Sequence, residues 1–235
     1  MGNASTAVLS AREYLEQLEE DIRQHPALNH PFLEKFSKGK LSLDRIRIFA
    51  RQYYLYSRWF TMYVSAVIAN MPDERPRAYL IKNLYQEYGE SNPQQAHPAI
   101  FRRFLKALRL DASEVERTEP LPETRLFIHE YLFICRDGHF LEALGALGPG
   151  TESIVPYIYH PIYEGLRKEP SLREEDTEFF TLHMSMDVEH SVNIKEALLD
   201  YAVTKENQDL IRQGAMEILG ARTVLWNGLE RACCG

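Results

Sequence analysis

One ten-residue stretch in the C-terminal third of the chain restricts the fold more than any other feature. It contains His183, Asp187 and His190, which are spaced by four and three residues. On an α-helix these positions fall within roughly 60° of one another, so two imidazoles and one carboxylate project from a single stripe. The stripe continues through Ile194 and Ala197, and these apolar residues indicate that it faces the interior of the protein.

Imidazoles and carboxylates that face an interior must be paired with other groups or bind an ion, because an isolated buried charge is costly. The mixture of nitrogen and oxygen donors suits iron, manganese or zinc. A polar network that braces a helix bundle is the alternative explanation of the same three side chains. Both explanations make this stretch an inward-facing helix.

Helical periodicity also dominates the rest of the chain, and no segment alternates with period two for long. We expect about eight to ten helices that pack as an all-α bundle. They form one domain over residues 1–235, with flexible tails at 1–9 and 231–235. The clearest of the expected helices cover about 10–24, 43–71, 74–89, 98–108, 123–136 and 206–230.

The composition argues against several classes of protein. The 235 residues carry a formal net charge of −7 with no long run of either sign, which disfavours a basic nucleic-acid-binding surface. No apolar run approaches the roughly 18–20 residues that cross a bilayer, and the N-terminus lacks the pattern of a secretory signal. The three cysteines form no framework spacing, so we expect a reducing compartment and a cytoplasmic protein.

The expected helix at 43–71 carries aromatic residues at three- or four-residue spacing. Such a stripe is most often core packing. Because buried tyrosine hydroxyls need partners, a polar cavity lined by some of these tyrosines is the alternative, with Tyr53 as a candidate catalytic residue. Arg222, beside Trp226, is a candidate anchor for a substrate carboxylate, because guanidinium binds carboxylate through two parallel hydrogen bonds. The alternative is a surface arginine without that role.

Three further donors, Glu87, His97 and Glu152, precede the histidine-rich helix. With them, the chain offers three imidazoles and three carboxylates. Helix bundles build two-metal sites from such parts, and six ligands suit two metals about 3.5–4 Å apart, whereas one iron needs only two histidines and a carboxylate. Simpler explanations exist. Glu87 is otherwise a surface glutamate, with Glu90 as its competitor. His97 is otherwise a helix cap, and Glu152 is otherwise favoured by the helix dipole.

Six short motifs are spread over nearly the whole chain. They are His30-Pro-Phe with Ser37-Lys-Gly-Lys-Leu, Gln52-Tyr-Tyr, Asn83-Leu-x-x-Glu87-x-Gly89, His97, Thr151-Glu152-Ser153 and Phe180-x-x-His183-x-x-x-Asp187-x-x-His190. They resemble the motifs of the haem-oxygenase-like di-iron oxidase superfamily. The resemblance is closest to the branch that includes the chlamydial protein associating with death domains, with pyrroloquinoline-quinone-synthase-like and TenA-like proteins as relatives.

The resemblance implies a haem-free bundle of seven or eight helices with a labile di-iron site. It implies two Fe(II) ions, or one manganese and one iron ion, with O2 as co-substrate, and we expect a homodimer. The ligands that it implies are Glu87, His97, Glu152, His183, Asp187 and His190. The gap between the first two is longer than in the family. If that gap rather than the Asn-Leu-x-x-Glu motif is kept, Glu90 takes the place of Glu87.

Two positions depart from the members of this branch that form 4-aminobenzoate. Those members use a sacrificial tyrosine and a lysine at the positions where this chain has Leu33 and Ile162. The resemblance therefore implies an O2-activating di-iron oxidase or oxygenase that acts on a small, carboxylate-bearing or amino-acid-like metabolite. A cofactorless oxidase or a TenA-like hydrolase of the same fold is one alternative, and a non-enzymatic interaction protein is another.

Overall fold

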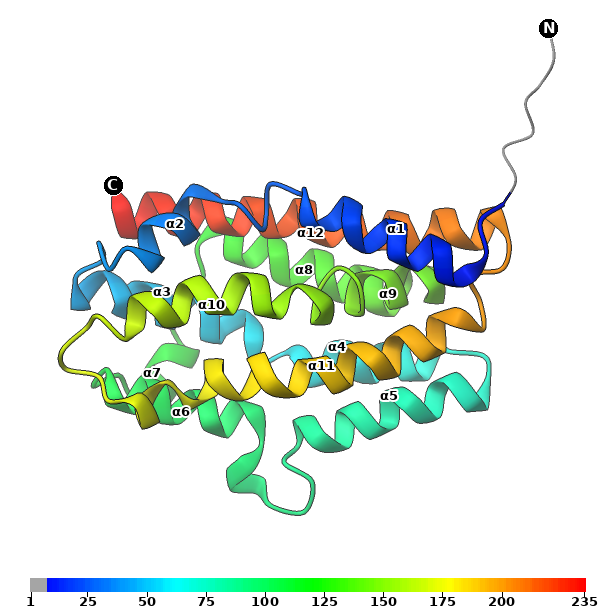
Figure 1. The fold of residues 1–235 in the computed structure, drawn as a ribbon. Coiled ribbons are helices and arrows are strands. Elements are labelled where there is room, and N and C mark those ends of the chain that lie inside the picture. Colours follow the sequence, from blue (N-terminus) through cyan, green and yellow to red (C-terminus); the bar gives the residue numbers. More distant parts are fainter. Residues whose placement is uncertain (1–7) are drawn as a thin grey trace, which may run out of the picture.

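The computed structural model describes residues 8–235, without the side chains of 186–190. In that part of the chain every regular element is helical, which confirms the all-α expectation. The long helices run side by side along one direction (Figure 1). The elements are α1 (Ala11–Arg23), α2 (Pro31–Ser37), α3 (Leu43–Ser57), α4 (Phe60–Asn70), α5 (Glu74–Glu87), η1 (Pro93–Gln95), α6 (His97–Ala107), α7 (Ala112–Glu116), α8 (Pro122–Asp137), α9 (Phe140–Leu147), η2 (Glu152–Ile154), α10 (Val155–Leu166), η3 (Glu174–Thr177), α11 (Glu178–Leu199) and α12 (Lys205–Cys234).

One continuous hydrophobic core joins these helices. The 30-residue helix α12 packs against α9, α8 and α3. Gly145 of α9 and Gly214 of α12 lie where these two helices touch through their backbones. A Cβ added to Gly145 would stand 2.0 Å from the carbonyl oxygen of Ile211, and one added to Gly214 would stand 1.9 Å from that of Glu142. The lack of a side chain at both positions therefore sets the close approach of α9 and α12.

The expected helix over 43–71 is two helices, α3 and α4, which meet at Arg58 and Trp59. The hydrogen-bond pattern tightens there. The N–H of Trp59 donates to the carbonyl of Tyr56 at 3.0 Å, and the N–H of Met62 donates to that of Trp59 at 2.8 Å. These three-residue steps turn the chain more sharply than α-helical bonds do. Both helices pack against α8, so the bend keeps two halves of an aromatic segment against one neighbour.

The expectation of a flexible tail over 231–235 is wrong, because α12 continues to Cys234. Arg231 in this last part of α12 pairs with Glu123 of α8, with 2.6 Å between Nη1 and Oε1. Tertiary contacts thus hold a helix end that carries no strong helical signal of its own. Of the expected N-terminal tail, residues 1–7 lie outside the described residues.

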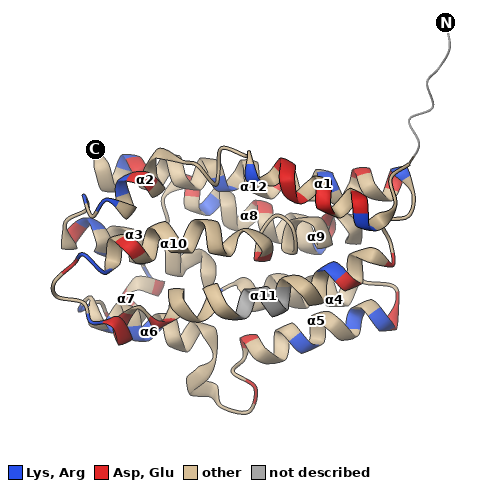
Figure 2. Ribbon diagram, viewed as in Figure 1, with Lys and Arg blue, Asp and Glu red and all other residues tan. Residues whose placement is uncertain are grey.

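Acidic and basic residues are intermixed over the helices, and neither sign gathers in one block (Figure 2). None of the described helices is long and apolar enough to span a membrane. The buried ionisable side chains are more informative, since burial of such groups is costly unless they are paired. They include Glu87, His97, Glu152, His183 and Arg222, all of which were expected at a site.

Candidate metal centre

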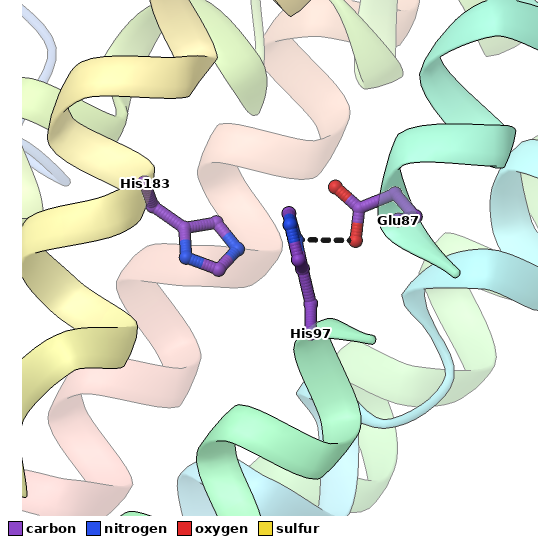
Figure 3. A group of neighbouring side chains, drawn as sticks. All are labelled: Glu87, His97 and His183. Carbon is purple, nitrogen blue, oxygen red and sulfur yellow. Dashed lines mark ion pairs between the residues drawn. The ribbon is translucent and has the colours of Figure 1, made fainter. Parts of the chain in front are cut away.

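Glu87, His97 and His183 come together from three helices, α5, α6 and α11 (Figure 3). Each side chain offers one ligand atom, and these atoms all lie within 4.8 Å of one another. The Nδ1 atom of His97 lies 2.7 Å from the Oε2 atom of Glu87, and the two imidazole ring centres are 4.3 Å apart. The exposed fractions of the three residues are 2%, 3% and 7%. The group is therefore shielded from bulk water.

A tight loop brings Glu87 next to His97. Glu87 ends α5 and His97 begins α6, whose N-cap is Ala96, so the capping explanation of His97 does not apply. Gly89 has a φ of +74°, and a Cβ there would stand 2.4 Å from the backbone nitrogen of Ala96, so this turn requires glycine. Glu90 lies in the same loop and is exposed. The structure thus brings Glu87, and not Glu90, to the two histidines.

The backbone of α11 fixes the proton on His183. Its Nδ1 atom lies 2.6 Å from the carbonyl oxygen of Phe179, one turn earlier in the helix. A carbonyl oxygen can only accept a hydrogen bond, so Nδ1 carries the proton and Nε2 keeps a lone pair. Metal-binding histidines are commonly oriented by a carbonyl or carboxylate in this way. His183 is therefore held in the tautomer that a metal ion at Nε2 requires.

A cavity of about 40 Å³ lies beside the three side chains. Glu152, at the start of η2, lines the same cavity and is 3% exposed. Much of the remaining wall is apolar or aromatic and includes Tyr56, Phe60, Val155, Tyr159 and Phe179. On this scale a volume of 40 Å³ holds roughly three water-sized molecules. The cavity therefore suits ions and a diatomic gas, and a larger ligand requires a side chain to move.

The side chains of Asp187 and His190, the other two expected ligands on this helix, lie outside the described residues. α11 is one helix from Glu178 to Leu199 and runs through both positions. The four- and seven-residue steps from His183 therefore apply to a helix, as expected. The assignment of these two residues as ligands stays a prediction.

A buried amide pair joins the helices that carry Glu87 and His183. The Nδ2 atom of Asn193 in α11 donates to the Oδ1 atom of Asn83 in α5 at 2.7 Å. The exposed fractions of the two residues are 9% and 1%. Asn83 lies one helical turn before Glu87, so the pair fixes α5 against α11 close to the donor group. The Asn-Leu-x-x-Glu motif contains the first asparagine, but nothing in the motif identifies its partner.

Tyr53, the expected catalytic tyrosine, does not line the cavity. It is fully buried, and its ring centre lies 6.1 Å from that of Tyr159 and 6.2 Å from that of Trp226. Burial raises the pKa of its hydroxyl well above the usual value. Tyr56 and Tyr159 line the cavity instead, and the ring of Tyr159 lies 5.7 Å from that of His183. These two tyrosines, rather than Tyr53, can touch a molecule in the cavity.

Arg222 is only 1% exposed, so the explanation of this residue as a surface arginine is wrong. Its guanidinium carbon lies 5.0 Å from the ring centre of Phe127 and 6.0 Å from that of Tyr56. Arg222 does not itself line the cavity, whereas Tyr56 does. The arginine thus adjoins the cavity wall through Tyr56.

The donor set fits a first-row transition-metal ion. Two imidazoles and one carboxylate within 4.8 Å match the two-histidine, one-carboxylate combination that binds iron(II), and Glu152 adds a second carboxylate. The lone pairs of a deprotonated Glu87 and a neutral His97 would repel at 2.7 Å unless a proton or a cation lies between them. Either a shared proton or a bound cation would satisfy this contact within the shielded cavity.

Comparison with known proteins adds independent information. Residues 47–223 match a protein family described as iron-containing redox enzymes. The chain is 28% identical over 217 residues to a 4-aminobenzoate synthase of Chlamydia pneumoniae, and the match covers 92% of this chain and 93% of that protein. It is 26% identical over 219 residues to a 4-chloro-allylglycine synthase of Streptantibioticus cattleyicolor, with coverage of 93% and 83%.

A solved structure agrees with the fold. A domain of unknown function from Shewanella denitrificans, described as having a haem-oxygenase-like fold, matches with a TM-score of 0.72 and 19% identity. The match covers 96% of this chain and 93% of that chain. At this identity the similarity supports the fold and carries no information on the substrate.

Proposed function

The chain belongs to the haem-oxygenase-like family of iron-containing redox enzymes, and we propose on that basis that it is an O2-activating oxidase or oxygenase with two iron ions. The observation that carries the proposal is the buried group of Glu87, His97 and His183. Desolvation of ionisable groups costs several kcal/mol per ion unless something compensates it. A cation that binds only the folded protein offsets the desolvation cost, and metal binding would explain why these three side chains are buried together.

The proposed ligands are Glu87, His97, Glu152, His183, Asp187 and His190. Bound Fe(II) supplies the electrons that reduce O2, and manganese is the alternative for one of the two ions. His183 keeps the lone pair of Nε2 available because Nδ1 donates to the carbonyl of Phe179. The aromatic wall of the cavity keeps bulk water away from the reacting groups, which limits side reactions.

We propose a small, carboxylate-bearing or amino-acid-like substrate that enters from solution. The names of the relatives support this class, since 4-aminobenzoate is a carboxylate and 4-chloro-allylglycine is an amino acid. Leu33 and Ile162 are buried core residues, at exposed fractions of 2% and 0%. Neither side chain has a hydroxyl or an amine to give up. These two side chains therefore cannot serve as the reactant, and we propose that the substrate is a separate molecule.

The test is anaerobic loading with Fe(II), followed by metal analysis and by absorbance measurements after O2 is admitted. We expect close to two iron ions per chain and an O2-dependent change in absorbance. His183→Ala should lower the iron content and remove the absorbance change. His160→Ala is the matched control, because this histidine is exposed and does not line the cavity. It should behave as the wild type.

Wild-type iron content in the His183→Ala variant would refute the assignment of the site. A cofactorless oxidase or a hydrolase would turn over substrate without any iron, and a non-enzymatic interaction protein would show neither iron binding nor O2 consumption. We also propose a cytoplasmic homodimer, from the sequence alone. Light scattering tests the oligomeric state.

A further inference from the structure

Arg222 is a buried cation without an acidic partner among the described side chains. No carboxylate of the described part of the chain forms an ion pair with it, and its Nε and Nη1 atoms have no hydrogen-bond acceptor there. The guanidinium lies against the rings of Phe127 and Tyr56, and it interacts with the hydroxyl of Tyr56 and, electrostatically, with Tyr53 and Tyr131. Buried polar groups in proteins are rarely left without a hydrogen-bond partner. An exception such as Arg222 therefore needs an explanation.

Two arginines on the same helix show the usual arrangement. Arg212 pairs with Asp21 at 2.6 Å, and Arg231 pairs with Glu123 at 2.6 Å. Both arginines are partly exposed, so water also solvates their charge and the ion pair is not required to offset a loss of hydration. Arg222 is the one of the three that loses its hydration, yet the described side chains offer it no such partner. Contact with aromatic faces recovers a part of that loss, but the N–H groups at Nε and Nη1 have no acceptor among the described residues.

Arg222 lies close to the cavity beside the donor group. Tyr56 both lines the cavity and contacts the guanidinium. On another side, the positive charge of Arg222 acts on Tyr131, whose hydroxyl donates to Thr151 at 2.9 Å, and Thr151 is a cavity residue next to Glu152. One ring contact, through Tyr56, and one electrostatic interaction, through Tyr131, therefore connect the arginine with the cavity wall. Arg222 lies one side chain behind that wall.

We infer that Arg222 and Tyr56 form an anion subsite that binds the carboxylate of the substrate. The inference rests on the proposed function, because it deepens the class of substrate given there. A cavity of about 40 Å³ has no room for a carboxylate-bearing metabolite beside the donor group. Rotation of Tyr56 would add that room and expose the guanidinium to it. Guanidinium is the side-chain group best matched to a carboxylate, which would supply acceptors to its unsatisfied N–H groups.

The experiment uses the metal-free full chain, so that iron cannot contribute. Benzoate and hexanoate are titrated calorimetrically against the wild type, with benzamide and hexanamide as uncharged probes of the same shape. We expect the two carboxylates to bind and the amides not to bind. Arg222→Met should weaken carboxylate binding at least about thirtyfold, which is the usual loss when one partner of a buried charge pair is removed. Arg212→Met is the matched control on the same helix and should bind as the wild type.

Stability and iron binding distinguish this role from a structural one. An apolar residue in place of an uncompensated buried cation is often neutral or stabilising, so metal-free Arg222→Met should melt no lower than the wild type. Its iron content should be unchanged. If Arg222→Met does not fold, Arg222→Lys decides the question, and it should bind carboxylate more weakly than the wild type.

Several results would overturn the inference. They are equal carboxylate binding by the wild type and the arginine variants, binding of amides as tight as that of carboxylates, or no carboxylate binding by the wild type. A fourth is the ultraviolet signature of a tyrosinate at neutral pH that disappears in Arg222→Met, because the anion beside Arg222 would then be a tyrosine of the protein rather than the substrate. Absence of carboxylate binding by a wild type that loads iron normally contradicts this inference alone. Carboxylate binding without any iron uptake by the wild type contradicts the proposed function alone.

Discussion

Asn193→Ala tests whether the buried amide pair holds the two ligand-bearing helices together. The substitution removes the donor that reaches the buried Oδ1 atom of Asn83 at 2.7 Å, so Asn83 loses this hydrogen bond. Removal of one partner from a buried hydrogen bond costs about 1–3 kcal/mol. For a chain of this size each kcal/mol corresponds to about 2–4 °C in melting temperature. We therefore expect Asn193→Ala to lower the melting temperature by about 2–12 °C.

The same change should act on metal binding, because α5 carries Glu87 and α11 carries His183. Loss of groups that support metal ligands typically weakens binding by about 10–100-fold, and we expect the lower end for a contact one turn away. The assay combines thermal unfolding of the metal-free protein with anaerobic titration of Fe(II). Asn70→Ala is the matched control. Its amide donates to the carbonyl of Arg136 at 2.7 Å, and it should lose stability without a change in iron affinity.

A double-mutant cycle gives the decisive result. If Asn83 and Asn193 interact as described, Asn83→Ala and Asn193→Ala should be non-additive by about 0.5–3 kcal/mol. Additive effects on the free energy of unfolding would refute the reasoning. An unchanged iron affinity in both variants would show that the pair supports the fold and has no influence on the site.

Three other predictions use the same protein. Glu87→Ala should lower iron content, whereas Glu90→Ala should not, because Glu90 is exposed in the loop with a φ of +57°; metal analysis of both variants decides between them. Fe(II) at a hundredfold excess over its dissociation constant should stabilise the wild type by about 2.7 kcal/mol, and a melting temperature that does not respond to Fe(II) would contradict metal binding by the folded state. The pKa of Glu123 is lowered by its hydrogen bond to Arg231. This pair therefore stabilises the protein above about pH 4.3 and loses that contribution as the pH falls through the lowered pKa. The destabilisation caused by Arg231→Met should shrink in acid, and a difference from the wild type that does not depend on pH would exclude the pair as its cause.

Local patterns were sufficient to predict the helices but not how they bend or end. The aromatic periodicity of 43–71 continues through Arg58 and Trp59, and nothing in it marks the bend between α3 and α4, both of which pack against α8. The end of α12 has no helical signal of its own, and its order comes from Arg231 and other contacts with distant elements. Both differences arise from tertiary structure, which overrides local propensity.

The donor group was more predictable than its surroundings. The motif register favoured Glu87 over Glu90, and the turn at Gly89 explains why the longer gap does not change that choice. Which tyrosine faces the cavity was not predictable, because Tyr53 and Tyr56 lie three residues apart on one helix and share its aromatic stripe, yet only Tyr56 lines the cavity. The spacing of residues along a helix predicts which side chains share a face, but it does not predict which other elements pack against that face.

The order of the donors along the chain has a consequence for biosynthesis. Glu87 and His97 emerge from the ribosome together, joined by the Gly89 loop, whereas His183 follows about ninety residues later. At about 5–20 residues per second, that interval lasts about 5–20 s. During this time the nascent chain offers one imidazole and one carboxylate of the proposed site, and later also Glu152. These are too few ligands to retain a ferrous ion against competition from other cellular ligands. Metallation is therefore a late step, and the supply of iron acts on a nearly complete polypeptide.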